Sequence, residues 1–204
     1  MNIYFQLPDK LRILKRVRRE VWAGLLIILL LAIVLAVFLQ APKVNLSRLS
    51  HYEKKLAYEE FELCGTGSGK TYEDYRMITD ETSDQYRLIK ETLKIDGKTG
   101  FLYDRDGFIA AALGYRFGAV GTRYYFTLDS GAVLPLIKTD EKAPKDASNG
   151  CEVDINGTVI EFVIDSDRAL SHFGTITNGL VLDGNFNNCP YLSGSIIRIE
   201  RVKE

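Results

Sequence analysis

The stretch RYYFTLDSGAVLPLIKTD, residues Arg123–Asp140, decides the fold of this chain. Two runs of aromatic, aliphatic and β-branched residues lie on either side of a turn, in which Ser130-Gly131 supplies a residue that accepts positive φ. Short apolar runs that end at turn residues, with no long helical periodicity between them, are typical of β-strands. The stretch therefore predicts two strands joined by a tight turn.

The same pattern continues on both sides, from Gly97 to the C-terminus. Further turns are predicted at Asp106-Gly107 and Asn156-Gly157. The apolar runs between the turns are TGFLYDRDG, FIAAALGYRFG, NGTVIEFVIDSD and GSIIRIERV. Such spacing predicts a mainly β domain over residues 97–204, arranged as a sandwich or a small barrel.

Many aromatic side chains are concentrated in this β region. They are Tyr103, Phe108, Tyr115, Phe117, Tyr124, Tyr125 and Phe126. An exposed subset could stack on sugars, but alternate residues of a strand normally face the core. We therefore assign most of them to packing.

Residues 41–96 are predicted to form a juxtamembrane helical and linker region. In VNLSRLSHYEKKLAYEEFEL, residues 44–63, apolar side chains recur near helical spacing, which predicts a helix after the membrane anchor. A second, short helix is predicted before Leu93, with Thr82, Ser83 or Asp84 as its N-cap.

An apolar run near the N-terminus predicts a membrane anchor. VWAGLLIILLLAIVLAVFL, from Val21 to Leu39, carries no charge, and a helix of this length nearly crosses a hydrocarbon core of ~30 Å. The run is longer than the core of a cleaved signal peptide, so it predicts an uncleaved transmembrane helix over residues 21–40. The tail 1–20 is rich in Lys and Arg, which places it in the cytoplasm and the rest of the chain outside the cell membrane.

Three cysteines, Cys64, Cys151 and Cys189, lie in the part predicted to be extracytoplasmic. An oxidising compartment permits one disulfide, and Cys151 with Cys189 is the favoured pair because both fall in the later, strand-rich part. The sequence leaves all three pairings open. It also leaves open that the three are simply small buried apolar side chains.

The net charge of −1 argues against a nucleic-acid partner. The stretch CGTGSGKTYEDY, residues 64–75, ends like a phosphate-binding loop at Gly69-Lys70-Thr71, but Cys64 occupies the position of the first glycine. No βαβ unit follows it. We therefore predict a flexible connector with a solvated Lys70, and no nucleotide.

Two further patterns in the sequence lack residues or a setting that their chemistry requires. Cys64 with His51 or His172 as base would make a thiol nucleophile, but neither histidine lies in a recognisable setting and His172 is predicted to lie in a loop. Asp183, Asn185 and Asn187 alternate as in a calcium loop, yet the required glycine and closing glutamate are missing. The sequence predicts neither a metal nor a cofactor.

Asp129 and Asp165 are the candidate catalytic residues. Each ends an apolar strand, where a carboxylate could face a groove and act as an acid or base. Aspartates that end strands are also common turn formers, and that interpretation is favoured for both.

The sequence also resembles a family of uncharacterised, membrane-anchored extracytoplasmic proteins of Gram-positive bacteria and their phages. The stretches that carry the resemblance are GKTYEDYRMITDETSDQYRL, DGFIAAALGYRFGAVGTRYYFTLDSGAVLPLIKTDEKA and GTVIEFVID, which cover most of residues 69–165. The last two are similar to double-psi β-barrels of cell-wall proteins, in which a G-T-x-V strand and a D-T-G turn recur.

The resemblance implies a double-psi-like barrel and, in some relatives, lytic cleavage of peptidoglycan by a single aspartate. Asp129 then falls on the D-T-G position and Asp165 is the other candidate. Ser130 replaces the threonine, and Thr139 stands where the family usually has glycine before Asp140. We therefore expect an accessory or binding module of the envelope, with peptidoglycan or an envelope protein as its partner and peptidoglycan cleavage as the alternative.

Overall fold

The structure is a computed structural model that describes residues 21–30, 45–174 and 185–203. The chain divides into two units, Met1–Ala41 and Pro42–Glu204. In the first unit, residues 21–30 form a helix with exposed side chains. No helix among the described residues is both long and apolar enough to cross a membrane. The predicted tail, 1–20, and the second half of the predicted span, 31–40, lie outside the described residues.

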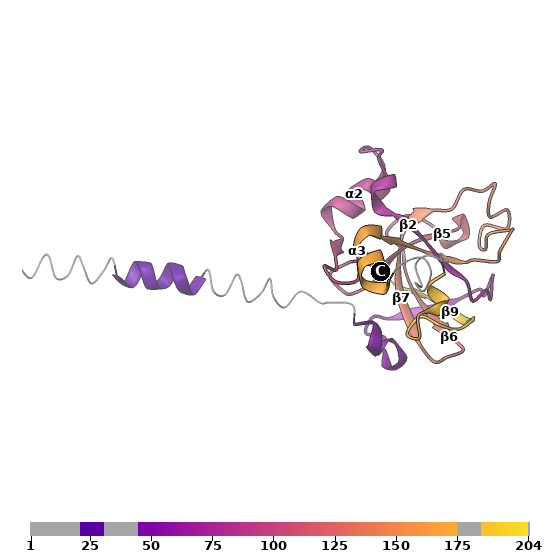
Figure 1. Ribbon diagram of the computed structural model, residues 1–204, viewed down its shortest axis with the longest axis horizontal. Helices are drawn as coiled ribbons and strands as arrows, with labels where there is room; N and C mark the ends of the chain where they lie inside the picture. The colour runs from indigo at the N-terminus through magenta and orange to yellow at the C-terminus, as the bar shows by residue number, and fades with distance from the viewer. Residues whose placement is uncertain (1–20, 31–44, 175–184, 204) are drawn as a thin grey trace, which may run out of the picture. The chain divides into compact units, whose positions relative to one another are not determined.

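The second unit is built on a mixed sheet of nine strands (Figure 1). The strands are β1 Tyr58–Phe61, β2 Lys70–Asp74, β3 Lys94–Ile95, β4 Leu102–Tyr103, β5 Ile109–Leu113, β6 Arg123–Leu128, β7 Val133–Glu141, β8 Ile160–Ile164 and β9 Ile196–Val202. Their main order is β1-β9-β6-β7-β5-β4-β3, with β8 joined to β5 and β2 joined to β8. The pairs β2–β8 and β5–β7 are parallel. The predicted mainly β class is confirmed, and the described sheet is open, with β1 and β3 at the ends of its main path.

Among the described residues of the second unit, two α-helices and four short 3₁₀ helices accompany the sheet. They are α2 Asp84–Glu91, α3 Ser166–Phe173, η2 Leu46–His51, η3 Tyr75–Met77, η4 Tyr115–Phe117 and η5 Phe186–Asn188. The Ser83 hydroxyl accepts a hydrogen bond from the Tyr86 amide and caps α2, so one of the three predicted caps is confirmed. His172 lies in α3, where the sequence predicted a loop.

The predicted pair of strands is confirmed as β6 and β7, joined by a turn with Gly131 at φ 84°. Alternate side chains of β6 enter different clusters. Tyr124 and Phe126 belong to the main core, whereas Tyr125 packs with Phe108 in another buried cluster. The sheet is therefore covered on both faces at β6, which explains why this strand is apolar throughout its length.

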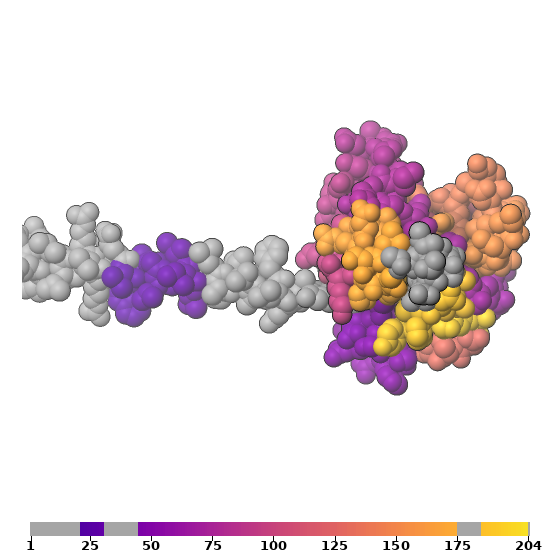
Figure 2. All heavy atoms as spheres, viewed as in Figure 1, coloured from indigo at the N-terminus to yellow at the C-terminus, as the bar shows by residue number. Residues whose placement is uncertain are grey.

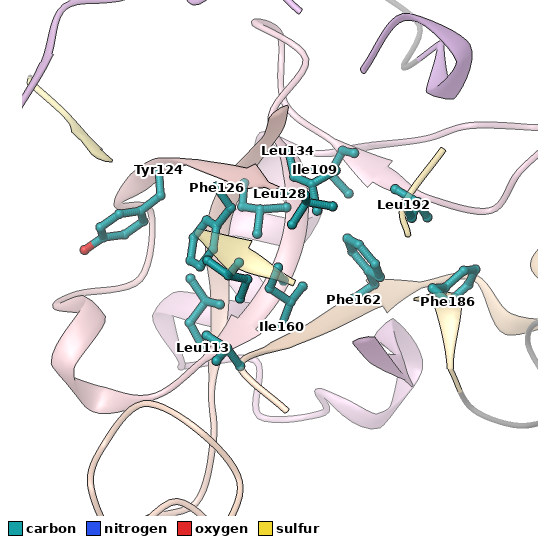
Figure 3. Packing of buried hydrophobic residues seen from close by; sticks show 14 of the residues in the cluster. Ile109, Leu113, Tyr124, Phe126, Leu128, Leu134, Ile160, Phe162, Phe186 and Leu192 are labelled. Carbon is teal, nitrogen blue, oxygen red and sulfur yellow. The ribbon is translucent and has the colours of Figure 1, made fainter. Parts of the chain in front are cut away.

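The main core lies between β6, β8 and the segments that close over them. Figure 3 shows Phe126 and Leu128 of β6 together with Ile160 and Phe162 of β8. Phe101 is fully buried, and its ring centroid lies 5.1 Å from that of Phe162. The prediction that the aromatic residues serve packing is confirmed for all seven except Tyr115, which is 46% exposed.

The predicted helix over residues 44–63 is wrong in its second half. Leu46 and Leu49 are buried three residues apart, which fits the short 3₁₀ helix η2. Tyr58–Phe61 instead forms β1, paired antiparallel with β9. Pairing with a distant strand overrides the local helical pattern. The predicted linker region, residues 41–96, therefore contributes β1, β2 and β3 to the sheet.

Candidate functional site

The structure pairs Cys64 with Cys151 and leaves Cys189 as a buried free thiol, so the favoured pair Cys151–Cys189 is wrong. The Cα atoms of Cys64 and Cys151 are 6.0 Å apart, a normal distance for a disulfide. Both Cys151 and Cys189 follow strand-rich sequence, but that position does not bring them together. The segment after β1 runs beside the loop between β7 and β8, and this contact selects Cys64.

The glycine-rich stretch after Cys64 is packed rather than a flexible connector. A Cβ atom on Gly67 would lie 2.0 Å from the carbonyl oxygen of Gly157, so only glycine permits this approach of two backbones. Gly65 is buried and faces Val159. The predicted flexible connector is therefore a fixed contact between the segment before β2 and the β7–β8 loop.

Lys70 is fully buried, in contrast to the predicted solvated charge. Its Nζ donates hydrogen bonds to the carbonyl oxygens of Ser68 and Gly194 and to Oδ1 of Asn187. Burial lowers the pKa of Lys70 to about 8, and the carboxylate of Asp129 opposes that shift. The lysine thus holds the segment before β9 against β2, and its three donors are used by the protein.

Of the three residues in the calcium-loop pattern, Asn185 and Asn187 are used in hydrogen bonds around Lys70. Asp183 lies outside the described residues. Asn185 accepts a hydrogen bond from the Lys70 amide, and Asn187 accepts from Lys70 Nζ and from the Gly194 amide. Both amide side chains therefore hold the chain together around Lys70.

Asp165 caps α3. Its Oδ1 accepts a hydrogen bond from the Arg168 amide, and its Oδ2 pairs with Arg168 Nε at 2.9 Å. The residue is only 8% exposed. Asp165 therefore acts as a helix cap, whereas the sequence favoured a turn former at this position.

Asp129 lies at the end of β6 and is exposed. Its Oδ1 accepts a hydrogen bond from the Ser195 amide, and its own amide donates to the Ser195 carbonyl oxygen. Asp129 fixes the turn that leads into β9, whereas Asp165 begins α3. No hollow of the four described below is lined by both residues.

Three carboxylates gather on one face where β2, β8, β5 and β7 adjoin. Ala112 of β5 is paired with Glu161 of β8 on one side and with Asp140 of β7 on the other. Glu161 is also paired with Thr71, and Glu73 follows two residues later on the same face of β2. The small side chain of Ala112 leaves room between the carboxylates. We call Glu73, Asp140 and Glu161 the carboxylate cluster.

Burial raises the pKa of Glu73 to about 8, Asp140 and Glu161 add to the shift, and Lys142 opposes it. Among the described residues, Oε1 of Glu73 is a buried side-chain oxygen without a hydrogen-bond partner. Two ionised carboxylates cannot hydrogen-bond to each other, but a protonated Glu73 can donate to Asp140. Glu73 therefore holds a proton at neutral pH, which is the state that a general acid requires.

Lys142 is the cation of this cluster. Its Nζ lies 3.9 Å from Oε2 of Glu161 and donates to the carbonyl oxygen of Thr158 at 3.1 Å. Burial lowers the pKa of Lys142, and Glu161 and Glu73 oppose that shift. The described residues contain no group of His, Cys, Asp and Glu side chains that could hold a metal ion.

The carboxylate cluster is not among the sites that the sequence predicts. The available signal was a charged residue inside an apolar strand, as in VIEFVI around Glu161. Such a residue lies on one face of a strand, but only the pairing of β5 with both β7 and β8 brings Asp140 and Glu161 together. That pairing joins segments that are far apart in the chain and is not readable from any one of them.

None of the four hollows considered on the folded unit is lined by a residue of the carboxylate cluster. The large hollow, about 900 Å³, includes Asp96, Lys98, Phe173 and Tyr191 in its lining. A second hollow of about 370 Å³ shares Asn45 with it, and a third of about 420 Å³ shares Gly97 and Lys98. A fourth lies beside α2. Figure 2 shows α3 in orange on the face toward the viewer, with the segment that begins at residue 45 in purple below it.

Comparisons of the chain with protein-family models, with curated proteins and with solved structures find no match in any of the three.

Proposed function

We propose that the chain is a single-pass membrane protein with a cytoplasmic N-terminus, and that its folded unit binds a polymer or protein of the cell envelope. The apolar run Val21–Leu39 and the basic tail before it support the anchor and its orientation. The large hollow is the observation that carries the binding role. Its volume of about 900 Å³ lies within the range of known ligand sites.

The position of the titratable groups favours binding over catalysis. A catalytic acid must lie within hydrogen-bond reach of its substrate. None of the four hollows is lined by Glu73, Asp140 or Glu161. Asp165 lines the third hollow, but its carboxylate is engaged by the Arg168 amide and guanidinium.

A pull-down tests this function directly. The full-length chain, held in detergent on beads, is expected to retain purified peptidoglycan or a defined envelope protein, and empty detergent-coated beads provide the control. Retention should fall when the large hollow is blocked by Lys98→Trp, because Lys98 is exposed and lines it. If neither peptidoglycan nor an envelope protein is retained, the proposed function fails.

The carboxylate cluster supports a second candidate function, the lytic or hydrolytic cleavage of peptidoglycan. A protonated Glu73 would supply the general acid that glycosidic cleavage requires, with Asp140 beside it helping to keep the proton on Glu73. This assignment replaces Asp129 and Asp165 with residues whose environment fits the chemistry. The resemblance of the sequence to double-psi β-barrels of cell-wall proteins supports this second candidate. The two parallel strand pairs within the mixed sheet are compatible with such a fold.

Cleavage has a separate measurement. If the cluster is catalytic, the full-length chain releases muropeptides from purified peptidoglycan, and Asp140→Asn lowers the rate by about 10²-fold or more. Asp129→Asn is the matched control and should leave the rate unchanged. Absence of release, or equal release by the Asp140→Asn variant, would remove this candidate and leave the binding role untouched.

A further inference from the structure

Lys70 and Asn187 place an amine and a carboxamide side by side inside the folded unit. We infer that their side chains join through a covalent amide bond, which makes the pair a modification site. The inference is independent of the proposed binding function. Lys70 Nζ lies 3.3 Å from Oδ1 of Asn187, and the two residues are 117 positions apart in the chain. The bond therefore ties the start of β2 to the segment before β9.

Lys70 has the environment of a nucleophilic amine. Its side chain is fully buried, and burial lowers its pKa to about 8. About a tenth of this side chain is therefore neutral at pH 7, with a free electron pair on Nζ. Its hydrogen-bond acceptors are neutral oxygens, the carbonyls of Ser68 and Gly194 besides Asn187 Oδ1. Conversion to an amide removes the charge from this buried position, which favours the reaction.

The neighbours of Asn187 hold its carboxamide in place and polarise it. The Gly194 amide donates to Asn187 Oδ1 at 2.9 Å, on the oxygen that becomes negative when an amine attacks. The Asn187 amide donates to Oδ1 of Asn185 at 3.0 Å. Between these two residues Phe186 is fully buried, with its ring centroid 5.4 Å from that of Phe162 (Figure 3). The carboxamide is therefore fixed before the reaction begins.

The reacting atoms are close enough for direct attack. Asn187 Cγ is bonded to Oδ1 at about 1.2 Å, so Lys70 Nζ lies no more than about 4.5 Å from that carbon. A shift of about 1 Å brings Nζ to an attack distance of about 3.5 Å. Groups held in this way react as if at a very high concentration, which offsets the low reactivity of a carboxamide.

The reaction replaces one amine by another at Asn187 Cγ. The electron pair of neutral Lys70 Nζ forms the bond to Cγ, and the π pair of the carbonyl moves onto Oδ1. When the carbonyl forms again, the Cγ–Nδ2 bond breaks, a proton of Nζ passes to Nδ2, and ammonia leaves. The balance needs no oxidant or further reactant. The bonded lysine no longer titrates, so any effect of Lys70 on the pH dependence of stability belongs to chains without the bond.

Mass spectrometry of the reduced and denatured full-length chain tests the inference. The natural chain should weigh about 17 Da less than its sequence requires, which is the mass of one ammonia molecule. Trypsin does not cleave after a lysine whose amine lies in an amide, so digestion should yield peptide 56–76 linked to peptide 169–198. After reduction, the natural chain should also migrate faster in a denaturing gel than the Asn187→Ala variant, because the bond closes a loop.

Three variants assign the bond to its two residues. Lys70→Arg removes the attacking amine and Asn187→Ala removes the carboxamide, so each should abolish the mass loss and the linked peptides. Asn188→Ala is the matched control, because Asn188 is exposed and adjoins the reacting residue, and it should keep both. The mass of the natural chain decides the inference even where a variant fails to fold.

Three outcomes would overturn the inference. The first is a natural chain that keeps its full mass after incubation for days at about pH 9, where most of Lys70 is neutral. The second is a loss of ammonia that digestion places elsewhere, such as at Asn156-Gly157. The third is an unchanged mass loss in the Asn187→Ala variant. Each leaves the binding function untouched, because that function is measured by retention of a ligand.

Discussion

Replacing Cys64 and Cys151 together with alanine is expected to lower the free energy of unfolding by about 4 kcal/mol. The disulfide joins residues 87 positions apart, and a loop of that length carries a large closure entropy in the unfolded chain. Cys151 is fully buried, and alanine there leaves no unpaired polar group. For a chain of this size we expect the midpoint of thermal unfolding, followed by circular dichroism, to fall by roughly 8–16 °C.

Single variants distinguish the three possible pairings. Cys64→Ala should destabilise the chain about as much as the double variant, because either change removes the bond. Cys189→Ala should cost only the loss of one small buried side chain, about 1 kcal/mol. Thiol titration of the unfolded natural chain should find one free cysteine. If Cys189→Ala frees a second thiol, or if Cys64→Ala has no effect, the Cys64–Cys151 bond is refuted.

The strands that the sequence predicts are those whose signal is local. The pair β6–β7 needs only two apolar runs and a residue with positive φ, and Gly131 supplies the latter. β1 carries no such signal, because Glu59 and Glu60 interrupt its apolar residues and its partner β9 lies at the other end of the chain. Tertiary pairing decides its structure, and propensity alone does not.

The candidate site also depends on strand pairing that no local sequence signal reveals. The sequence favoured a turn-forming role for Asp129 and Asp165. Asp165 caps a helix through the amide of Arg168, three residues away, whereas Asp129 binds the amide of Ser195, 66 positions along the chain. The cluster of Glu73, Asp140 and Glu161 depends on the register of four strands. A shift of one residue in β2, β7 or β8 would place the carboxylate of that strand on the other face. Sequence alone therefore cannot bring these groups together.

Glu73→Gln is expected to remove much of the loss of stability that the natural chain shows as pH rises toward 8. The pKa of Glu73 is raised in the folded chain from 4.5 to about 8. Between these values the folded state keeps a proton that the unfolded state has released. The free energy of unfolding therefore falls as pH rises, by about 3 kcal/mol after allowance for the partial exposure of the side chain.

Comparing the natural chain with the Glu73→Gln variant shows whether Glu73 causes the pH dependence of stability. Below pH 4.5 protonated glutamic acid and glutamine are both neutral, so the two chains should have similar stability. Near pH 8 the variant should be the more stable, because glutamine avoids a charge beside Asp140 and Glu161 and its amide can donate to Asp140. Glu91→Gln, an exposed carboxylate at the end of α2, should keep the pH dependence of the natural chain.

Lys70 limits the pH range in which this measurement is made. Its pKa is lowered from 10.5 to about 8, so above pH 8 the unfolded state binds the extra proton and stability rises with pH. Urea unfolding at pH values from about 5 to about 7.5 separates the effect of Glu73 from that of Lys70. In this range only Glu73, and not Lys70, differs in protonation between the folded and unfolded states. If the Glu73→Gln variant keeps the full slope over this range, Glu73 does not share a proton with Asp140, and the acid–base candidate loses its physical basis.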